Sequence, residues 1–201
     1  MNKIDYGIYI VHAAFWSTLA VTVMVLRWLG GKSASQSDPP PLATEGGTAP
    51  YSRALLAFHM LAFFAMYFGV GQAVFTSGVP AWFPGQRIAG GVVIAAGAAL
   101  INWTLVFFRS WRYRAKLDIG HELATGGPFR FLRHPIYMGL NLLALGTAIW
   151  IPTAFVWTGF GLMVIGSDLR GRAEEAILDK AFGAAYRDYC SRTRRFLPGI
   201  Y

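Results

Sequence analysis

The first stretch of sequence whose residue types could do chemistry is 117–139, which reads LDIGHELATGGPFRFLRHPIYMG. Arg130, Arg133 and His134 lie close together there, just before Pro135. Proline suits the first position of a helix, because the N–H that it lacks would be unpaired there anyway. A helix start flanked by cations attracts a carboxylate or a phosphate. The alternative is that these residues are interfacial anchors that follow the positive-inside rule.

The second stretch is 168–175, Asp-Leu-Arg-Gly-Arg-Ala-Glu-Glu. On a helix Glu174 and Glu175 project about 100° apart, and Arg170 lies one turn before Glu174. Paired acids in a basic region could bind an ammonium group or a ribose diol through charge-assisted hydrogen bonds. The alternative is a surface ion pair with Arg170 or Arg172 that contributes a few tenths of a kcal/mol, which is about what exposed pairs give.

Other polar residues give weaker signals. Four of them fall inside apolar segments, where such groups either serve function or join helices by hydrogen bonds: His12, His59, Gln72 and Asn102. His121 and His134 have no Cys or carboxylate near them that completes a recognisable ligand set, so we expect no metal site.

Apolar segments must position these residues, since 55% of the chain is hydrophobic and only 14% is charged. Segments 6–26, 54–75 and 88–108 contain no Asp, Glu, Lys or Arg, and each is long enough to cross a bilayer, which takes ~20 apolar residues. We therefore predict an all-α polytopic membrane protein, with residues 1–201 forming a single integral membrane domain.

The fourth apolar stretch, 137–167, would make a helix of about 46 Å, too long for one span and too short for two ordinary ones. Pro152 would break it. We predict a hairpin of two short helices, 137–150 and 153–167, which brings the number of membrane helices to about five. Residues 168–195 should then form a cytosolic amphipathic helix, because apolar and aromatic residues recur there at three-to-four spacing.

The distribution of charge predicts the orientation and limits the partners. Lys and Arg gather in the first loop, after the third span and after the hairpin, so these regions should face the cytosol and the N-terminus should lie outside. We expect a prokaryotic inner membrane. The formal charge of +8 forms no stripe that could track phosphates, so we expect no nucleic-acid partner.

The motifs follow one another in a specific order: His-x-Leu-x-x-x-Gly-Pro-Phe-Arg, Arg-His-Pro-x-Tyr-x-Gly, an apolar hairpin, Arg-x-Glu-Glu-x-x-Leu, Phe-Gly-x-x-Tyr and Arg-Phe-Leu-Pro. This set, over 121–198, resembles the isoprenylcysteine carboxyl methyltransferase family and its relatives, the phospholipid methyltransferases. The first three spans match only as membrane helices.

The resemblance implies an S-adenosylmethionine site within 117–198, open to the cytosol, with an entrance from the lipid for an apolar substrate. It implies catalytic roles for Arg133, His134, Glu174 and Glu175, without deciding which glutamate contacts the cofactor. The residues that it implies for cofactor binding are His121, Leu123, Gly126, Arg133, His134, Pro135, Tyr137, Leu140, Arg170, Glu174, Glu175 and Tyr186.

The residue chemistry agrees with such a site, since S-adenosylmethionine needs a cation or helix start, an acid and apolar walls. A carboxylate acceptor needs no base, whereas a thiol or an amine would need one, with His134 or Glu175 nearest. Prenylated-cysteine carboxylates, phospholipid amines and lipophilic thiols remain open as acceptors. The expected partners are therefore a lipophilic small molecule or a lipid-modified substrate, together with membrane lipids.

Two other functions compete. Membrane sterol reductases have a similar Arg-His-Pro-x-Tyr and paired-acid pattern and bind NADPH, although they normally have more membrane helices upstream. A non-catalytic scaffold or transporter subunit would bind neither cofactor. Titration with S-adenosylmethionine, S-adenosylhomocysteine and NADPH separates the three functions.

Overall fold

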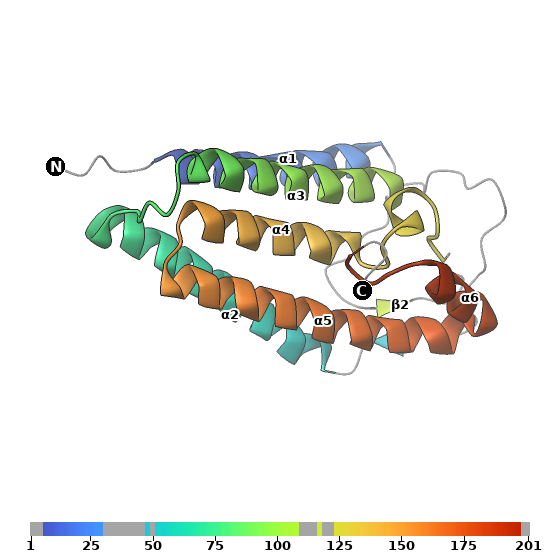
Figure 1. Cartoon of the computed structure of the whole chain (residues 1–201). Coiled ribbons are helices and arrows are strands. Elements are labelled where there is room, and N and C mark those ends of the chain that lie inside the picture. The colour runs from blue at the N-terminus through green and yellow to red at the C-terminus, as the bar shows by residue number, and fades with distance from the viewer. Residues whose placement is uncertain (1–5, 30–46, 49–50, 109–115, 118–122, 198–201) are drawn as a thin grey trace.

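The computed structural model describes residues 6–29, 47–48, 51–108, 116–117 and 123–197, and within them it is almost entirely helical (Figure 1). The elements, in chain order, are α1 (Gly7–Trp28), β1 (Gly47–Thr48), α2 (Ser52–Gln72), the π-helix η1 (Ala73–Ser77), α3 (Gln86–Phe108), β2 (Lys116–Leu117), the 3₁₀-helix η2 (Gly127–Arg130), α4 (Pro135–Trp150), α5 (Ala154–Phe182) and α6 (Ala184–Arg192). The two-residue strands β1 and β2 pair antiparallel.

Three helices are long and apolar enough to cross a membrane: Gly7–Trp28, Ser52–Phe75 and Gln86–Phe107. They coincide closely with the first three predicted spans. Large apolar side chains on their outer faces, such as Phe64 (67% exposed) and Ile88 (74% exposed), are suited to lipid rather than water.

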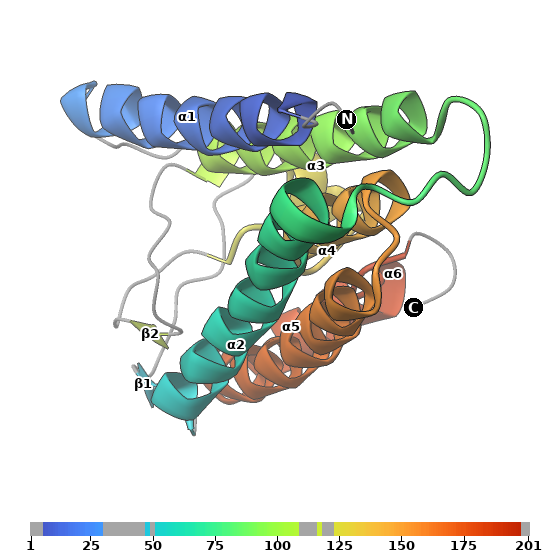
Figure 2. The ribbon, with the colours of Figure 1, turned by 90° about the vertical axis from the view of Figure 1, so that its left-hand side faces the viewer.

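The long helices pack in pairs. α3 lies along α4, and α2 lies along α5 on the other side of the molecule (Figures 1 and 2). Glycines allow the α3–α4 approach: a Cβ on Gly90 would lie 2.6 Å from the carbonyl oxygen of Gly146, and a Cβ on Gly97 would lie 2.6 Å from that of Gly139. Such small residues let helix backbones come close within a membrane.

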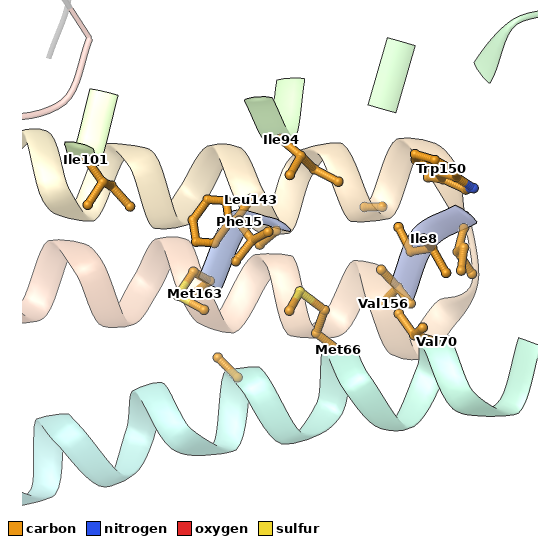
Figure 3. Close-up of a cluster of buried hydrophobic side chains, with 14 of the residues drawn as sticks. Ile8, Phe15, Met66, Val70, Ile94, Ile101, Leu143, Trp150, Val156 and Met163 are labelled. Atoms are coloured by element: carbon orange, nitrogen blue, oxygen red, sulfur yellow. The ribbon is translucent and has the colours of Figure 1, made fainter. Parts of the chain in front are cut away.

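The main core lies between these helices, where their apolar faces meet (Figure 3). Phe15 of α1, Met66 of α2, Ile94 of α3, Leu143 of α4 and Met163 of α5 are all at most 2% exposed. A second apolar cluster lies beside α6 and is formed by Leu123, Ala181, Phe182, Tyr186 and Tyr189.

A hydrogen-bond chain ties α1 to α2 and α4. Thr147 donates to the carbonyl of Leu143 (2.7 Å), so its hydroxyl accepts from Nε2 of His12 (2.9 Å). The other ring nitrogen of His12, Nδ1, then accepts from the Tyr67 hydroxyl (2.9 Å), which itself accepts from Trp16 (2.7 Å). His12 therefore joins helices, as one of the two sequence interpretations had it.

The chain breaks where Pro152 predicted it, between the end of α4 at Trp150 and the start of α5 at Ala154. The prediction of a separate helix beginning at Asp168 is wrong, because α5 continues for 29 residues to Phe182. The change from apolar to charged residues at Asp168 alters the surroundings that suit the side chains, but it does not interrupt the backbone hydrogen bonds of the helix. The break comes at Gly183, whose φ of +53° ends α5, and α6 follows.

Candidate functional site

The start of α4 is held by a segment far away in the sequence. Leu132 and Arg194 form an isolated parallel bridge. Beside it, the backbone N–H of Arg133 donates to the carbonyl of Arg194 (2.8 Å), and that of His134 donates to the carbonyl of Arg195 (3.2 Å). This pairing brings the side chains of Arg133, His134 and Arg195 to the same place.

Glu175 of α5 lies at the centre of these three side chains. Its Oε1 accepts from Nε of Arg133 (2.9 Å) and Nε of Arg195 (3.0 Å) and lies 3.2 Å from Nε2 of His134; its Oε2 accepts from Nη2 of Arg195 (2.6 Å). Burial alone would raise the pKa of the Glu175 carboxyl, but the hydrogen bonds from His134, Arg195 and Arg133 outweigh it and hold the pKa well below its usual range.

Glu174, the neighbouring acid, meets a different set of groups. It accepts a hydrogen bond from the Tyr137 hydroxyl and lies 4.0 Å from Nη2 of Arg170. The guanidinium carbon of Arg170 lies 5.1 Å from the centre of the Tyr137 ring, within range of a cation–π interaction. The side chain of Glu174 is 23% exposed, against 15% for that of Glu175.

His134 bridges the two acids. Its Nδ1 lies 3.5 Å from Glu174 and its Nε2 lies 3.2 Å from Glu175, so both nitrogens can donate only when the ring is an imidazolium. Burial would lower the pKa of His134, but the hydrogen bonds to the two carboxylates raise it above its ordinary value. Gly171 leaves the necessary room, since a Cβ there would lie 3.3 Å from the imidazole.

The structure thus brings together six of the residues named from sequence: Arg133, His134, Tyr137, Arg170, Glu174 and Glu175. We call these six, together with Arg195, the polar cluster. Arg172, the alternative basic partner, is 59% exposed and binds Asp168 instead.

The remaining residues named for cofactor binding lie around this cluster. Leu123 and Tyr186 belong to the second apolar cluster, where both side chains are buried. Pro135 is buried at the first position of α4, and Leu140 packs against the main core.

Gly126 precedes η2 and lies under the Phe107 ring, so that a Cβ there would come within 2.8 Å of it. His121 lies outside the described residues.

Sequence reasoning missed Arg195 as a member of the cluster. Arg195 binds Asp168 (2.9 Å) as well as Glu175. Its place in the Arg-Phe-Leu-Pro motif was the one available signal in the sequence. Its contact with Glu175 could not be foreseen, because it depends on the chain folding back beside Leu132.

Comparison with known proteins identifies the family of the segment that carries most of this cluster. Residues 86–185, about half of the chain, match the sequence model of the family described as phospholipid methyltransferase. This segment belongs to the phospholipid methyltransferase family. It contains α3, η2, α4 and α5, and with them every member of the polar cluster except Arg195.

Curated relatives agree with this result. The chain is 32% identical over 81 residues to proteins named probable protein-S-isoprenylcysteine O-methyltransferase from Oryza sativa subsp. indica and subsp. japonica; the match covers 40% of this chain and 42% of each relative. It is 30% identical over 82 residues to protein-S-isoprenylcysteine O-methyltransferase of Dictyostelium discoideum, covering 40% of this chain and 35% of the relative. The matched part thus spans about two fifths of these relatives.

These matches confirm the resemblance to the isoprenylcysteine carboxyl methyltransferase and phospholipid methyltransferase families. The family match and the three long apolar helices together identify the chain as an integral membrane protein. The relatives come from a plant and an amoeba, so they lend no support to the expected prokaryotic inner membrane.

Proposed function

We propose that the chain is an S-adenosylmethionine-dependent methyltransferase that acts on a lipophilic or membrane-embedded acceptor. The observation that carries this proposal is the polar cluster, which gathers paired acids, arginines and a histidine at the start of α4 within the phospholipid methyltransferase segment.

The residues present fit the chemical groups of that cofactor, which supplies an electrophilic methyl group when bound. Arg133 and Arg170 offer positive charge for its carboxylate, and Glu174 offers an acceptor for its ammonium group or ribose diol. Leu123 and the buried ring of Tyr186 offer apolar walls.

The two acids have different roles in this proposal. Both oxygens of Glu175 are already occupied by guanidinium groups, so Glu175 orients Arg133 and His134. Glu174 is more exposed and accepts from the uncharged Tyr137, and its contacts with cations are longer, 3.5 Å to Nδ1 of His134 and 4.0 Å to Nη2 of Arg170. We therefore assign the contact with the cofactor to Glu174.

The state of the cluster favours an acceptor that arrives as an anion. Because the pKa of Glu175 is held low and that of His134 is raised, the first is a weak base and the second keeps its proton. Neither is suited to deprotonate a thiol or an amine. A carboxylate needs no base, and the names of the curated relatives specify O-methylation of an isoprenylcysteine.

The test begins with the protein purified in detergent. Calorimetric titration should give saturable binding of S-adenosylmethionine and S-adenosylhomocysteine but not of NADPH. Binding of NADPH alone would favour the sterol-reductase alternative, and binding of none of the three would favour the non-catalytic scaffold or transporter subunit.

Acceptor chemistry is then tested with radiolabelled S-adenosylmethionine and three acceptors: an S-prenylated cysteine with a free carboxylate, a phosphatidylethanolamine and a lipophilic thiol. We expect transfer to the carboxylate, and none to the same prenylcysteine whose carboxylate is blocked as a methyl ester. Transfer to the amine or the thiol instead would contradict the assignment of the acceptor.

A further inference from the structure

Two polar contacts join α4 to α5 along the same helix faces. The first is between Tyr137 and Glu174 in the polar cluster. In the second, Ser167 donates a hydrogen bond of 2.9 Å to Oδ1 of Asn141. Residues four or seven positions apart in a helix share a face, so the second contact continues the line of the first.

His59 of α2 reaches the second contact. Its Nδ1 lies 3.3 Å from the carbonyl of Leu55, which can only accept, so Nδ1 carries the ring proton. Its Nε2 lies 3.4 Å from Oγ of Ser167 and is left as an acceptor. The single hydroxyl proton of Ser167 is donated to Asn141, and His59 shares it only as the longer branch of a bifurcated hydrogen bond.

All three residues are buried. Ser167 is 0% exposed, His59 2% and Asn141 8%. Buried polar groups are costly unless they are paired, so this trio permits few alternative registers of the helices. The packing is also tight, since a Cβ on Gly166 would lie 3.1 Å from the His59 ring.

We propose that the Asn141–Ser167 pair, braced by His59, positions the site. It fixes the rotation and register of α5 against α4, so that the two acids of α5 face the start of α4. None of the three residues belongs to the polar cluster, and the His59 ring lies against the ring of Tyr137, a cluster member, with centroids 5.9 Å apart. This inference rests on the proposed methyltransferase function.

The variant Ser167→Ala removes the shared donor without creating a large cavity. If the trio positions the acids, this variant should lose roughly tenfold to a hundredfold in kcat/KM, the range expected from a displacement of about 1 Å at a site. The dissociation constant of S-adenosylmethionine should rise as well. A residue that only stabilises the fold would leave both constants of the folded protein unchanged.

Thr147→Val is the matched control. It removes another fully buried hydroxyl that bonds a histidine of a different helix. Among the described residues, that hydroxyl bonds His12 and the carbonyl of Leu143, neither of which belongs to the polar cluster. We expect it to lower the thermal midpoint as Ser167→Ala does and to keep kcat/KM within about twofold of the wild type, as expected of a site that is not coupled to the cluster.

Coupling gives a second criterion. Asn141→Leu should cause a similar loss of kcat/KM, and the Asn141→Leu/Ser167→Ala double variant should lose no more than either single variant, because both changes break one contact. Additive losses would overturn the proposal. So would wild-type kinetic constants in Ser167→Ala, whereas a wild-type protein that binds no S-adenosylmethionine would refute the proposed function itself.

Discussion

Glu175 is the residue on which the polar cluster depends, because it compensates two guanidinium groups and an imidazole at once. Replacing Glu175 by Gln should lower the free energy of unfolding by about 3 kcal/mol, since breaking a largely buried ion pair leaves its partners uncompensated. Chemical or thermal unfolding in detergent measures this effect.

An exposed ion pair provides the control for Glu175. Asp179 bonds Arg187 at 3.0 Å, with side chains 49% and 65% exposed. Asp179→Asn should change stability by less than about 1 kcal/mol, as for other surface pairs. Equal effects of the two substitutions would mean that the ion pairs of the polar cluster are no stronger than surface pairs.

The cluster also predicts how stability depends on pH. The pKa of Glu175 is lowered, so its contribution is present above its ordinary value of 4.5 and is lost as the pH falls. The pKa of His134 is raised, so its contribution is complete below its ordinary value of 6.5 and is lost as the pH rises through the folded-state pKa. Together they stabilise the fold most in the interval between these two values.

The measurement compares the thermal midpoints of the wild type and His134→Asn in this interval and at alkaline pH. The difference between the two proteins should be largest near pH 6, within that interval, and should shrink in alkaline buffer. A difference that grows toward alkaline pH would mean that the folded state holds His134 neutral.

At the level of elements, the α3–α4 contact depends on glycine. A Cβ on Gly146 would lie 2.6 Å from the carbonyl oxygen of Gly90. Gly146→Ala should therefore destabilise the protein by about 1–3 kcal/mol, the usual cost of overpacking.

Gly161 of α5 is the matched control for Gly146, since a Cβ there meets nothing within 4 Å. Gly161→Ala should be neutral or stabilising by up to about 1 kcal/mol, because alanine favours the helix. Thermal midpoints of both variants decide this, and equal destabilisation would contradict the close approach of α3 and α4.

The helices were predictable to different degrees for physical reasons. Spans 6–26, 54–75 and 88–108 were found because lipid requires long uncharged stretches, and Pro152 announced the break after α4. The continuation of α5 past Asp168 was not predicted. The sequence shows where apolar residues give way to charged ones, but this change does not mark the end of a helix.

The site divides in the same way. Arg133, His134, Glu174 and Glu175 could be named from residue types and motif order. Arg195, Asn141 and Ser167 could not, and His59 was named only as a polar residue inside a span, because their contacts appear only once the helices are packed.

At the level of the whole molecule, α6 and the start of α4 lie at one end, while the 78–85 connection and the turn between α4 and α5 lie at the other (Figure 1). Of the described Lys and Arg residues, only Arg87 belongs to the second end. The positive-inside rule then predicts that the α6 end faces the cytosol.

Cysteine labelling tests this orientation in a Cys190→Ser background, which removes the one native cysteine. Ala81→Cys and Ser191→Cys place a thiol at exposed positions of the two ends. In intact cells a membrane-impermeant maleimide should label Ala81→Cys, and it should label Ser191→Cys only after permeabilisation. The reverse pattern would invert the topology.

The bridge between Leu132 and Arg194 has a consequence for biogenesis. Synthesis runs from the N-terminus, so Glu175 leaves the ribosome 20 residues before Arg195, one of its principal counter-ions. Until Arg195 follows, Glu175 lacks a partner that contacts both of its carboxylate oxygens. The polar cluster can therefore be completed only after Arg195 has also left the ribosome.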